Sequence, residues 1–406
     1  MQLSIKRFQG DSGERFSILV DETGMPLYYP ALYITASLRG ASLSVNTINN
    51  ALSAIKMVCA WEEYYSLDME SRFKRSELLA PHEIHSLRDF MQKPLAETRP
   101  KQGKVVSIKG RPKRVGKENQ YNRMSVAADY LGFIAGRLHP VTATSAKEIA
   151  AMATQIKASR PKMGSKVEDD RSTVHTEDAL LDLVEQIIRP GNDENPVRGY
   201  GLQLRNALMF TLLRMTGVRR GELLNFKIED FDFAVGTVKV VRRPDSPGDR
   251  RTYQPVAKTR ERTIPLISDL MDRIWEYIEN HRNKVPGARK HGYLFVTHRA
   301  CKTQGWPLSC SGFGKFIGTL SALSEETAGL HTHALRHHWN YIFSKRCEEQ
   351  GRTPEFEEQM RSYLMGWSAT SGTAATYNKR HVKEAAGKAV IGLQNKHLGK
   401  KSDDCE

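Results

Sequence analysis

The spacing of hydrophobic residues between positions 44 and 160 predicts helices. In four stretches, apolar side chains recur at intervals of three or four residues, which is the period of an amphipathic helix. Pro81 suits the first turn of the second helix, and Ser145 with Glu148 predicts a capping box at the start of the fourth. The four stripes are Ile48, Leu52, Ile55 and Cys59; Ile84, Leu87 and Met91; Val126, Tyr130, Leu131, Ile134 and Leu138; and Ile149, Met152 and Ile156. We therefore expect a compact all-helical domain over residues 41–160.

Residues 1–40 show a strand-like pattern instead. The run Phe16–Val20 is rich in residues that favour strands, and the turn-forming residues Asp21–Gly24 follow it. Leu27–Pro30 again has a strand-like composition. The prediction for this region is a strand-rich amino-terminal arm, such as a small hairpin.

A linker is predicted over residues 161–173, which contain proline, glycine and charge but no apolar period. Helical periodicity resumes at Thr176, and one face of this next helix is expected to face the core. The residues expected on that face are Leu180, Leu183, Val184 and Ile187. A second domain is therefore expected to begin at about residue 174.

The second domain, over residues 174–390, is predicted to combine helices with a β-ribbon. Two strand-like runs lie at Gly236–Arg242 and Arg262–Leu266. Helices are expected near residues 202–215, 268–281, 310–322, 331–345 and 354–365. The fold class is therefore mainly α with a small β-ribbon, an all-helical domain being followed by a mixed α+β domain. Residues 391–406 remain as a carboxy-terminal tail.

Composition and charge narrow the function. The chain has 406 residues, with 61 Lys+Arg against 46 Asp+Glu and a net charge of +15, so a polyanion such as nucleic acid is the expected partner. The simpler alternative is a basic protein without such a partner. The hydrophobic share of 39% argues against a disordered chain, and no apolar run is long enough to span a membrane. The start shows no secretory leader, and the cysteines are scattered, so we expect a cytoplasmic protein.

A run of cations stands between the second and third predicted helices. It contains no acidic residue, and glycines and a proline predict a loop. Unbalanced positive charge favours contact with a DNA backbone, although a solvated loop is the alternative. The basic residues of the run are Lys101, Lys104, Lys109, Arg111, Lys113, Arg114 and Lys117.

Four segments of the second domain carry side chains suited to phosphate chemistry. They are Thr216–Leu224, Ala257–Arg262, His331–Trp339 and Leu364–Ser368, followed by Thr376 and Tyr377. Gly217 can end a helix in the left-handed conformation, which places Arg219 at the start of the next. Lys258 is expected in a turn between the two strands. His333 and Arg336 lie three residues apart and share a helical face.

Each segment has a simpler explanation when it is taken alone. An arginine after a helix joint is often a surface residue, a lysine in a turn is usually solvated, and most tyrosines only pack. His333 and His337 have a spacing found in zinc sites, but Ala334 stands where a zinc protease has glutamate. No metal and no other cofactor is therefore expected.

Together and in this order, the four segments resemble the tyrosine recombinase family, also called phage integrases. The signature of that family is Arg in a TGxRxxE segment, Lys in a β-turn, His-x-x-Arg, His or Trp after a Gly, and then Tyr. The matching residues are Arg219, Lys258, His333, Arg336, Trp367 and Tyr377. The resemblance covers residues 174–390 by motif and residues 41–160 by architecture only. It implies a helical core-binding domain followed by a catalytic domain.

The resemblance also implies a role for each residue. Tyr377 attacks a DNA phosphorus and forms a 3′-phosphotyrosyl link, which preserves the bond energy without ATP or metal. Arg219 and Arg336 hold the phosphate, and Lys258 protonates the departing 5′-oxygen. His333 assists proton transfer or orients the phosphate. Trp367, which stands where most members have His, donates a hydrogen bond or supports the pocket, and Glu222 supports the arginine.

The expected function is therefore site-specific recombination of duplex DNA, as by the integrase or transposase of a mobile element. Alternatives are a type IB topoisomerase-like relaxing enzyme, a chromosome or plasmid dimer resolvase, and a DNA-binding regulator on an inactive scaffold. By the same resemblance, two domains clamp the duplex, four protomers join two sites, and accessory directionality proteins assist. The tail carries Ala386, Val390, Ile391 and Leu393, which pack either on the same chain or on a neighbour.

Overall fold

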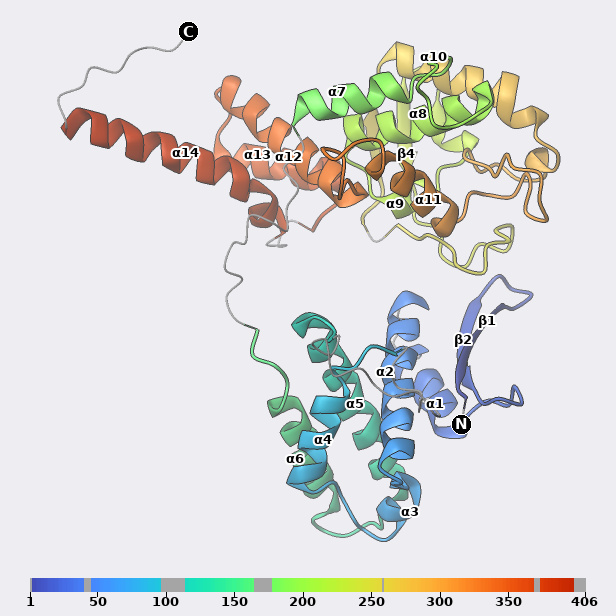
Figure 1. Cartoon of the computed structure of the whole chain (residues 1–406), viewed down its shortest axis with the longest axis vertical. Helices are drawn as coiled ribbons and strands as arrows, with labels where there is room; N and C mark the ends of the chain where they lie inside the picture. Colours follow the sequence, from blue (N-terminus) through green and yellow to red (C-terminus); the bar gives the residue numbers. More distant parts are fainter. Residues whose placement is uncertain are drawn as a thin grey trace. The chain divides into compact units, whose positions relative to one another are not determined.

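The computed structural model describes residues 2–39, 45–95, 114–163, 177–257, 259–368 and 373–397. Its contacts divide the chain into two units, Met1–Asp169 and Asp170–Glu406, and each unit is described by itself (Figure 1). Within the described residues, no helix combines the length and the apolar character needed to cross a membrane. The fold class predicted from the sequence, mainly α with a small β-ribbon, is confirmed.

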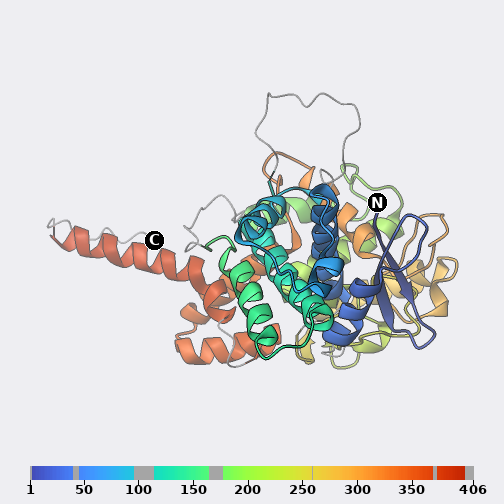
Figure 2. The same cartoon turned by 90° about the horizontal axis from the view of Figure 1, so that it is seen from below.

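The amino-terminal unit is a helical bundle with a hairpin on one side. Its elements are β1 (Ser4–Gln9), β2 (Arg15–Val20), α1 (Tyr28–Tyr33), α2 (Val45–Tyr64), α3 (Met69–Lys74), α4 (Pro81–Phe90), α5 (Lys117–Leu138) and α6 (Ser145–Ala158). α5 packs against α2 and α6, and the helices of this unit lie close together in both views (Figures 1 and 2). Leu52, Ile55 and Trp61 of α2 are completely buried. The apolar stripe predicted for α2 thus faces the core of this unit.

Two local predictions for this unit are wrong. Leu27–Pro30 was expected to be strand-like, but helix α1 begins at Tyr28; Pro30 lies in its first turn, where a missing N–H costs nothing. The capping box at Ser145 is absent, because Thr144 is the capping position and makes no side-chain bond there. The Ser145 hydroxyl instead donates to the carbonyl of Thr142 over 3.0 Å. The hairpin itself forms, with β1 and β2 antiparallel.

The carboxy-terminal unit packs several helices and a small sheet around helix α8. Its elements are α7 (Asp178–Ile187), α8 (Tyr200–Thr216), α9 (Arg220–Leu223), β3 (Phe231–Asp232), β4 (Thr237–Val240), β5 (Arg262–Pro265), α10 (Ser268–Glu276), α11 (Cys310–Ser321), α12 (Thr332–Glu349), α13 (Pro354–Met365) and α14 (Thr373–His397). α8 contacts α7, α10 and α12, and its buried residues include Leu208, Phe210 and Leu212. This helix is the centre of the core that positions the candidate site.

The β-ribbon has the two expected strands and a third. β4 pairs with β5 in antiparallel register, with Val238 opposite Ile264, and the short strand β3 adds to the other edge of β4. The inner face of α7 is shifted from the prediction, since Leu181 and Val184 are buried whereas Leu183 is 38% exposed. The apolar run around these residues fits two helical registers one residue apart, and only the contact with α8 selects between them.

Helix α14 leaves the body of the unit (Figures 1 and 2). It packs on α12 and α13 and continues across position 390 to His397. Val390, Ile391 and Leu393 are 50–63% exposed, so the described part of this chain does not cover them.

Candidate active site

Arg219 is placed by a tight joint between α8 and α9. α8 ends at Gly217, whose φ of +61° is left-handed, and a Cβ there would lie only 3.0 Å from the ring of Trp339. Arg219 is the N-cap of α9, and its backbone N–H donates to Oε2 of Glu222 over 3.0 Å. Its side chain is one-third exposed, and Nη1 has no hydrogen bond within the described residues. The guanidinium is therefore partly exposed, with Nη1 buried 3.8 Å from Oε1 of Glu222.

Glu222 fixes this joint from inside. It is 1% exposed, accepts from Nη2 of Arg262 over 2.9 Å, and also accepts from the hydroxyl of Thr259. Burial alone would raise the pKa of Glu222, but the charge and hydrogen bonds of Arg262, with those of Thr259 and the Arg219 amide, lower it overall. Glu222 is thus an anion that ties the Arg219 backbone to β5.

Arg336 on α12 connects three of the four segments. It is 2% exposed, Nη1 donates to the carbonyl of Gly217, and Nη2 lies 3.4 Å from the carbonyl of Met365. Its guanidinium carbon is 5.5 Å from the ring centroid of Trp367, which is itself buried. Arg336 thereby holds the Arg219 joint and the Trp367 segment against one helix.

The fourth segment also contacts the turn before β5. The backbone N–H of Arg260 donates to the carbonyl of Gly366 over 3.0 Å, and Nε of Arg262 donates to that of Leu364. Gly366 has a left-handed φ of +66°, and a Cβ there would lie 2.8 Å from that of Thr259. The fold therefore brings the four segments predicted from the sequence together, because each segment contacts at least one of the others.

Two histidines line up on α12. The rings of His333 and His337 meet edge to face, with centroids 4.5 Å apart. Burial lowers the pKa of His333, and the charges of His331, Arg336 and Arg219 add to that effect. Burial and the neighbouring His333 lower the pKa of His337 to about 4. Both rings are therefore neutral at pH 7.

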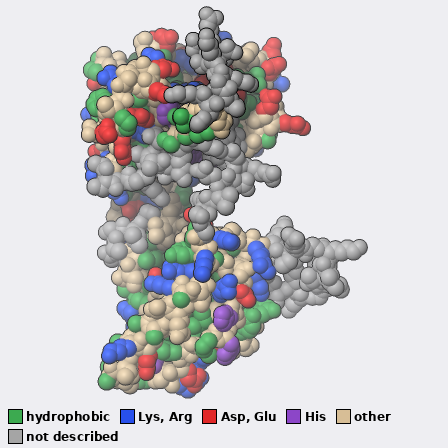
Figure 3. Space-filling model, turned by 90° about the vertical axis from the view of Figure 1, so that its left-hand side faces the viewer, with side chains coloured by type: hydrophobic (Ala, Val, Ile, Leu, Met, Phe, Trp, Pro, Cys, Tyr) green, Lys and Arg blue, Asp and Glu red, His purple; other side chains and the backbone are tan. Residues whose placement is uncertain are grey.

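The remaining predicted residues fall partly outside the described chain. Lys258 is not described, although its neighbours Ala257 and Thr259 are buried. In the basic run only Arg114 and Lys117 are described, and both are exposed. Lys101, Lys104, Lys109, Arg111 and Lys113 lie outside the described residues. Figure 3 shows further Lys and Arg side chains gathered on one side of the amino-terminal unit.

Tyr377 lies in α14, and its side chain is outside the described part. The helix itself is fastened to α12, which carries His333 and Arg336. The hydroxyl of Tyr341 on α12 donates to Oε2 of Glu384 over 2.6 Å. This bond fixes the helix of the expected nucleophile against the helix of the expected phosphate ligands.

Sequence reasoning missed the residues that support this site. Arg262 and Thr259 hold Glu222, and Tyr341 holds Glu384, but the sequence predicted none of these contacts. A signal existed for Arg262, because it begins a strand at an inward position where an arginine needs a partner. Tyr341 gave no such signal, since its partner is 43 residues away.

A sequence model of the phage integrase family matches residues 174–383, just over half of the chain. The chain belongs to the phage integrase family. All six residues that carried the resemblance lie inside the phage integrase match, from Arg219 to Tyr377.

Several individual proteins are similar to this chain. The tyrosine recombinase XerD of Halalkalibacterium halodurans is 28% identical over 182 residues, 42% of this chain and 53% of that protein. XerC of the same organism is 31% identical over 158 residues, 38% and 44% of the two chains. The chain thus spans about half the length of these curated relatives. A crystal structure of the XerH site-specific recombinase bound to palindromic difH substrate is similar with a TM-score of 0.48 and 15% identity, covering 88% of this chain and 83% of that one.

Proposed function

We propose that this phage integrase family member is a site-specific DNA recombinase that cuts and rejoins duplex DNA through a 3′-phosphotyrosyl link. The observation that carries the proposal is the position of Arg336, whose contacts join the Arg219 joint to the Trp367 segment. Arg336 thereby holds the joint that carries Arg219, and the helix with Arg336 and neutral His333 packs against the helix that contains Tyr377. Such a group suits a phosphodiester, which needs charge stabilisation and proton transfer.

The proposed reaction balances within the chain's own residues. The phenol oxygen of Tyr377 attacks phosphorus, the bond from phosphorus to the 5′-oxygen breaks, and that oxygen takes a proton from Lys258. Neutral His333 accepts the proton of the tyrosine. Arg219 and Arg336 stabilise the five-coordinate phosphorus, and a 5′-hydroxyl attacking the phosphotyrosine reverses the step.

Trp367 and Glu222 are proposed to act through these groups. The ring of Trp367 packs over the Arg336 guanidinium, which supports a buttressing role, and its indole N–H is a possible donor to the phosphate. Glu222 bonds the Arg219 backbone rather than supplying a reacting group. The cation run from Lys101 to Lys117 is proposed to contact the DNA backbone.

The proposed biological setting is the integrase or transposase of a mobile element. Relative to a minimal dimer resolvase, the chain has additional stretches near residues 99–118, 242–252, 283–306 and 345–356. Dimer resolution is the second candidate, and the XerC and XerD names of the curated relatives favour it. The same names, which say tyrosine recombinase, favour recombination over a topoisomerase-like activity.

The proposed assembly is a tetramer that joins two duplexes, with a directionality protein as a possible partner. Exposed Val390, Ile391 and Leu393 on α14 support docking of this helix on a neighbouring copy. The free thiols of Cys59, Cys310 and Cys347 suit a reducing cytoplasm.

Covalent capture tests the proposed function. The protein is incubated in EDTA with a pool of nicked duplexes of random sequence, and denatured protein is recovered with its attached DNA. We expect the protein to be attached to the 3′ end of the broken strand, and the attached DNA to be enriched for one sequence. DNA recovered without enrichment would favour relaxation, and no adducts at all would contradict the cleavage chemistry.

A further inference from the structure

The connection between β4 and β5 is rich in arginine. Seven of its residues from Val241 to Arg262 are basic and three are acidic. The basic residues are Arg242, Arg243, Arg250, Arg251, Lys258, Arg260 and Arg262. Lys258 is the expected catalytic residue of this connection. Its surface arginines belong neither to the recombinase signature nor to the proposed reaction.

Three of these arginines form internal ion pairs, and the pair of Arg262 with Glu222 belongs to the candidate site described above. Arg251 and Asp249 are nearly fully buried, and Nη2 of the arginine lies 2.7 Å from Oδ2 of the aspartate. Nη1 of Arg243 donates to Asp230 over 3.0 Å. These pairs add no net charge to the surface, but they fix the shape of the connection.

The buried pair also fastens the connection beside Arg219. Nη1 of Arg251 donates to the carbonyls of Leu224 and Leu308, each over 2.9 Å, and Leu224 directly follows α9. At Gly221 in α9, a Cβ would lie 3.0 Å from the carbonyl oxygen of Val256. The connection is therefore a supported extension of the segment that carries the candidate phosphate ligand.

Three arginines of the connection remain exposed. Arg242, Arg250 and Arg260 form no ion pair with an acidic side chain within the residues that the structure describes. The acceptor Glu261 takes its hydrogen bond from the Arg242 backbone, not from the guanidinium. Because Val240 pairs with Arg262, residues 242 and 260 leave the sheet at the same end.

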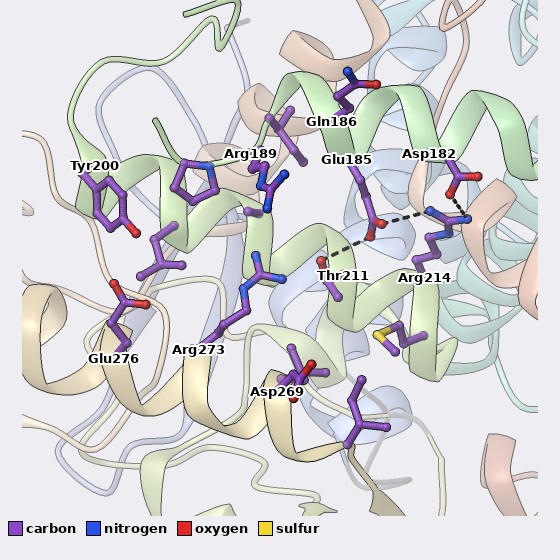
Figure 4. A pocket seen from close by; sticks show the side chains of 17 residues that line it. Asp182, Glu185, Gln186, Arg189, Tyr200, Thr211, Arg214, Asp269, Arg273 and Glu276 are labelled. Atoms are coloured by element: carbon purple, nitrogen blue, oxygen red, sulfur yellow. Dashed lines mark hydrogen bonds and ion pairs between the residues drawn. The ribbon is translucent and has the colours of Figure 1, made fainter. Parts of the chain in front are cut away.

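The groove between α7, α8 and α10 gives a contrast. Its lining contains Arg189, Arg214 and Arg273, interleaved with Asp182, Glu185, Asp269 and Glu276 (Figure 4). Arg214 alone lies 2.7 Å from Asp182 and 3.0 Å from Glu185. Carboxylates thus pair with Arg214 and stand beside the other two groove arginines, whereas Arg242, Arg250 and Arg260 lie on a connection with more basic than acidic residues.

We propose that Arg242, Arg250 and Arg260 form an arginine surface that binds the phosphate backbone of duplex DNA next to the bond that is cut. This inference rests on the proposed function, which identifies DNA as the ligand. The arginine surface is an additional part of the protein that binds this DNA. Planar guanidinium groups suit phosphate oxygens. When exposed cations neutralise phosphates, the counterions condensed on the DNA are released, which favours binding. Such contacts position the duplex without reading its sequence.

The salt dependence of DNA binding tests the arginine surface. The double variant Arg242→Gln/Arg250→Gln and the matched control Arg189→Gln/Arg273→Gln remove the same charge, and each is titrated with a mixed-sequence duplex over a range of salt concentrations. The slope of log K against log salt is negative, and we expect it to become shallower by about 0.9 for each phosphate that the double variant no longer neutralises. The control is expected to keep the parent slope. Arg242→Lys/Arg250→Lys keeps the charge and is expected to restore the slope, which separates an effect of charge from a damaged fold.

Equal slopes for the double variant and the parent would overturn the proposal. Equal reductions of slope in the double variant and the control would overturn it too, because net charge alone would then explain the effect. Covalent capture with the parent protein is measured separately. If adducts are absent but the slope changes as expected, the cleavage chemistry fails and the arginine surface stands.

Discussion

The groove between α7, α8 and α10 and the candidate active site use arginine differently. The groove has a volume of about 890 Å³, and four carboxylates stand among its three arginines (Figure 4). At the candidate site, Arg336 is held by backbone carbonyls and an aromatic ring, and Arg219 has only a 3.8 Å contact with Glu222, a carboxylate that already pairs with Arg262. A carboxylate cancels the field of an arginine, whereas a carbonyl orients the group and leaves its charge available.

Loss of Arg219 is expected to have the largest effect. Arg219→Ala removes a group that stabilises transition-state charge, so adduct formation should slow by about 10²–10³-fold. Arg273→Ala in the groove is the matched control and should leave the rate unchanged. Both rates are measured by denaturing gel on the captured sequence, at saturating protein. Similar losses of rate in the two variants would remove the distinction between the regions.

Buried and exposed ion pairs should differ in stability. Asp249→Asn leaves Arg251 buried without that carboxylate and should lower the free energy of unfolding by about 3–5 kcal/mol. Asp182→Asn breaks a pair whose aspartate is 68% exposed and should cost at most about 1 kcal/mol. Urea denaturation of both variants gives the comparison. Equal costs would mean that the Arg251 pair is not the anchor of the connection.

The fastening of α14 should affect rate more than binding. Tyr341→Phe removes the hydrogen bond to Glu384, a bond to a charged group worth about 1.5–3 kcal/mol. Adduct formation should fall by roughly ten-fold with unchanged DNA affinity, since each 1.4 kcal/mol is about ten-fold. Tyr363→Phe, at a 61% exposed position, should have no effect. Complete loss of adducts in Tyr341→Phe would instead suggest that Tyr341 is the nucleophile.

The fourth prediction concerns the dependence of stability on pH. The pKa of His337 is lowered to about 4 in the folded state, below the ordinary value of about 6.5 in the unfolded chain. Between these values the unfolded state binds more protons, so stability should fall as pH drops from about 6.5 to 4. His337→Gln should flatten this part of the profile, measured by urea denaturation at several pH values. An unchanged profile would mean that protonation of His337 is not disfavoured by folding.

The sequence predicted the helices and the reactive segments for different reasons. Helix α2 was predictable because one stripe of apolar residues faces the core. The four segments were predictable because phosphate chemistry uses few residue types. α1 and the face of α7 were misread because local composition fits more than one conformation there. Long-range partners were not predictable, since Arg262 reaches Glu222 across 40 residues. The roles of all the site residues stay predictions, and for Lys258 and Tyr377 they rest on order in the chain alone.

Mapping the residue that carries DNA tests the central claim most directly. Adducts formed by the parent protein are digested with protease and nuclease, and the peptide that retains a nucleotide is identified by mass spectrometry. The account predicts a single modified peptide with the nucleotide on Tyr377, and no adduct from Tyr377→Phe although that variant still binds DNA. A nucleotide on any other residue, or adducts that persist in Tyr377→Phe, would contradict it.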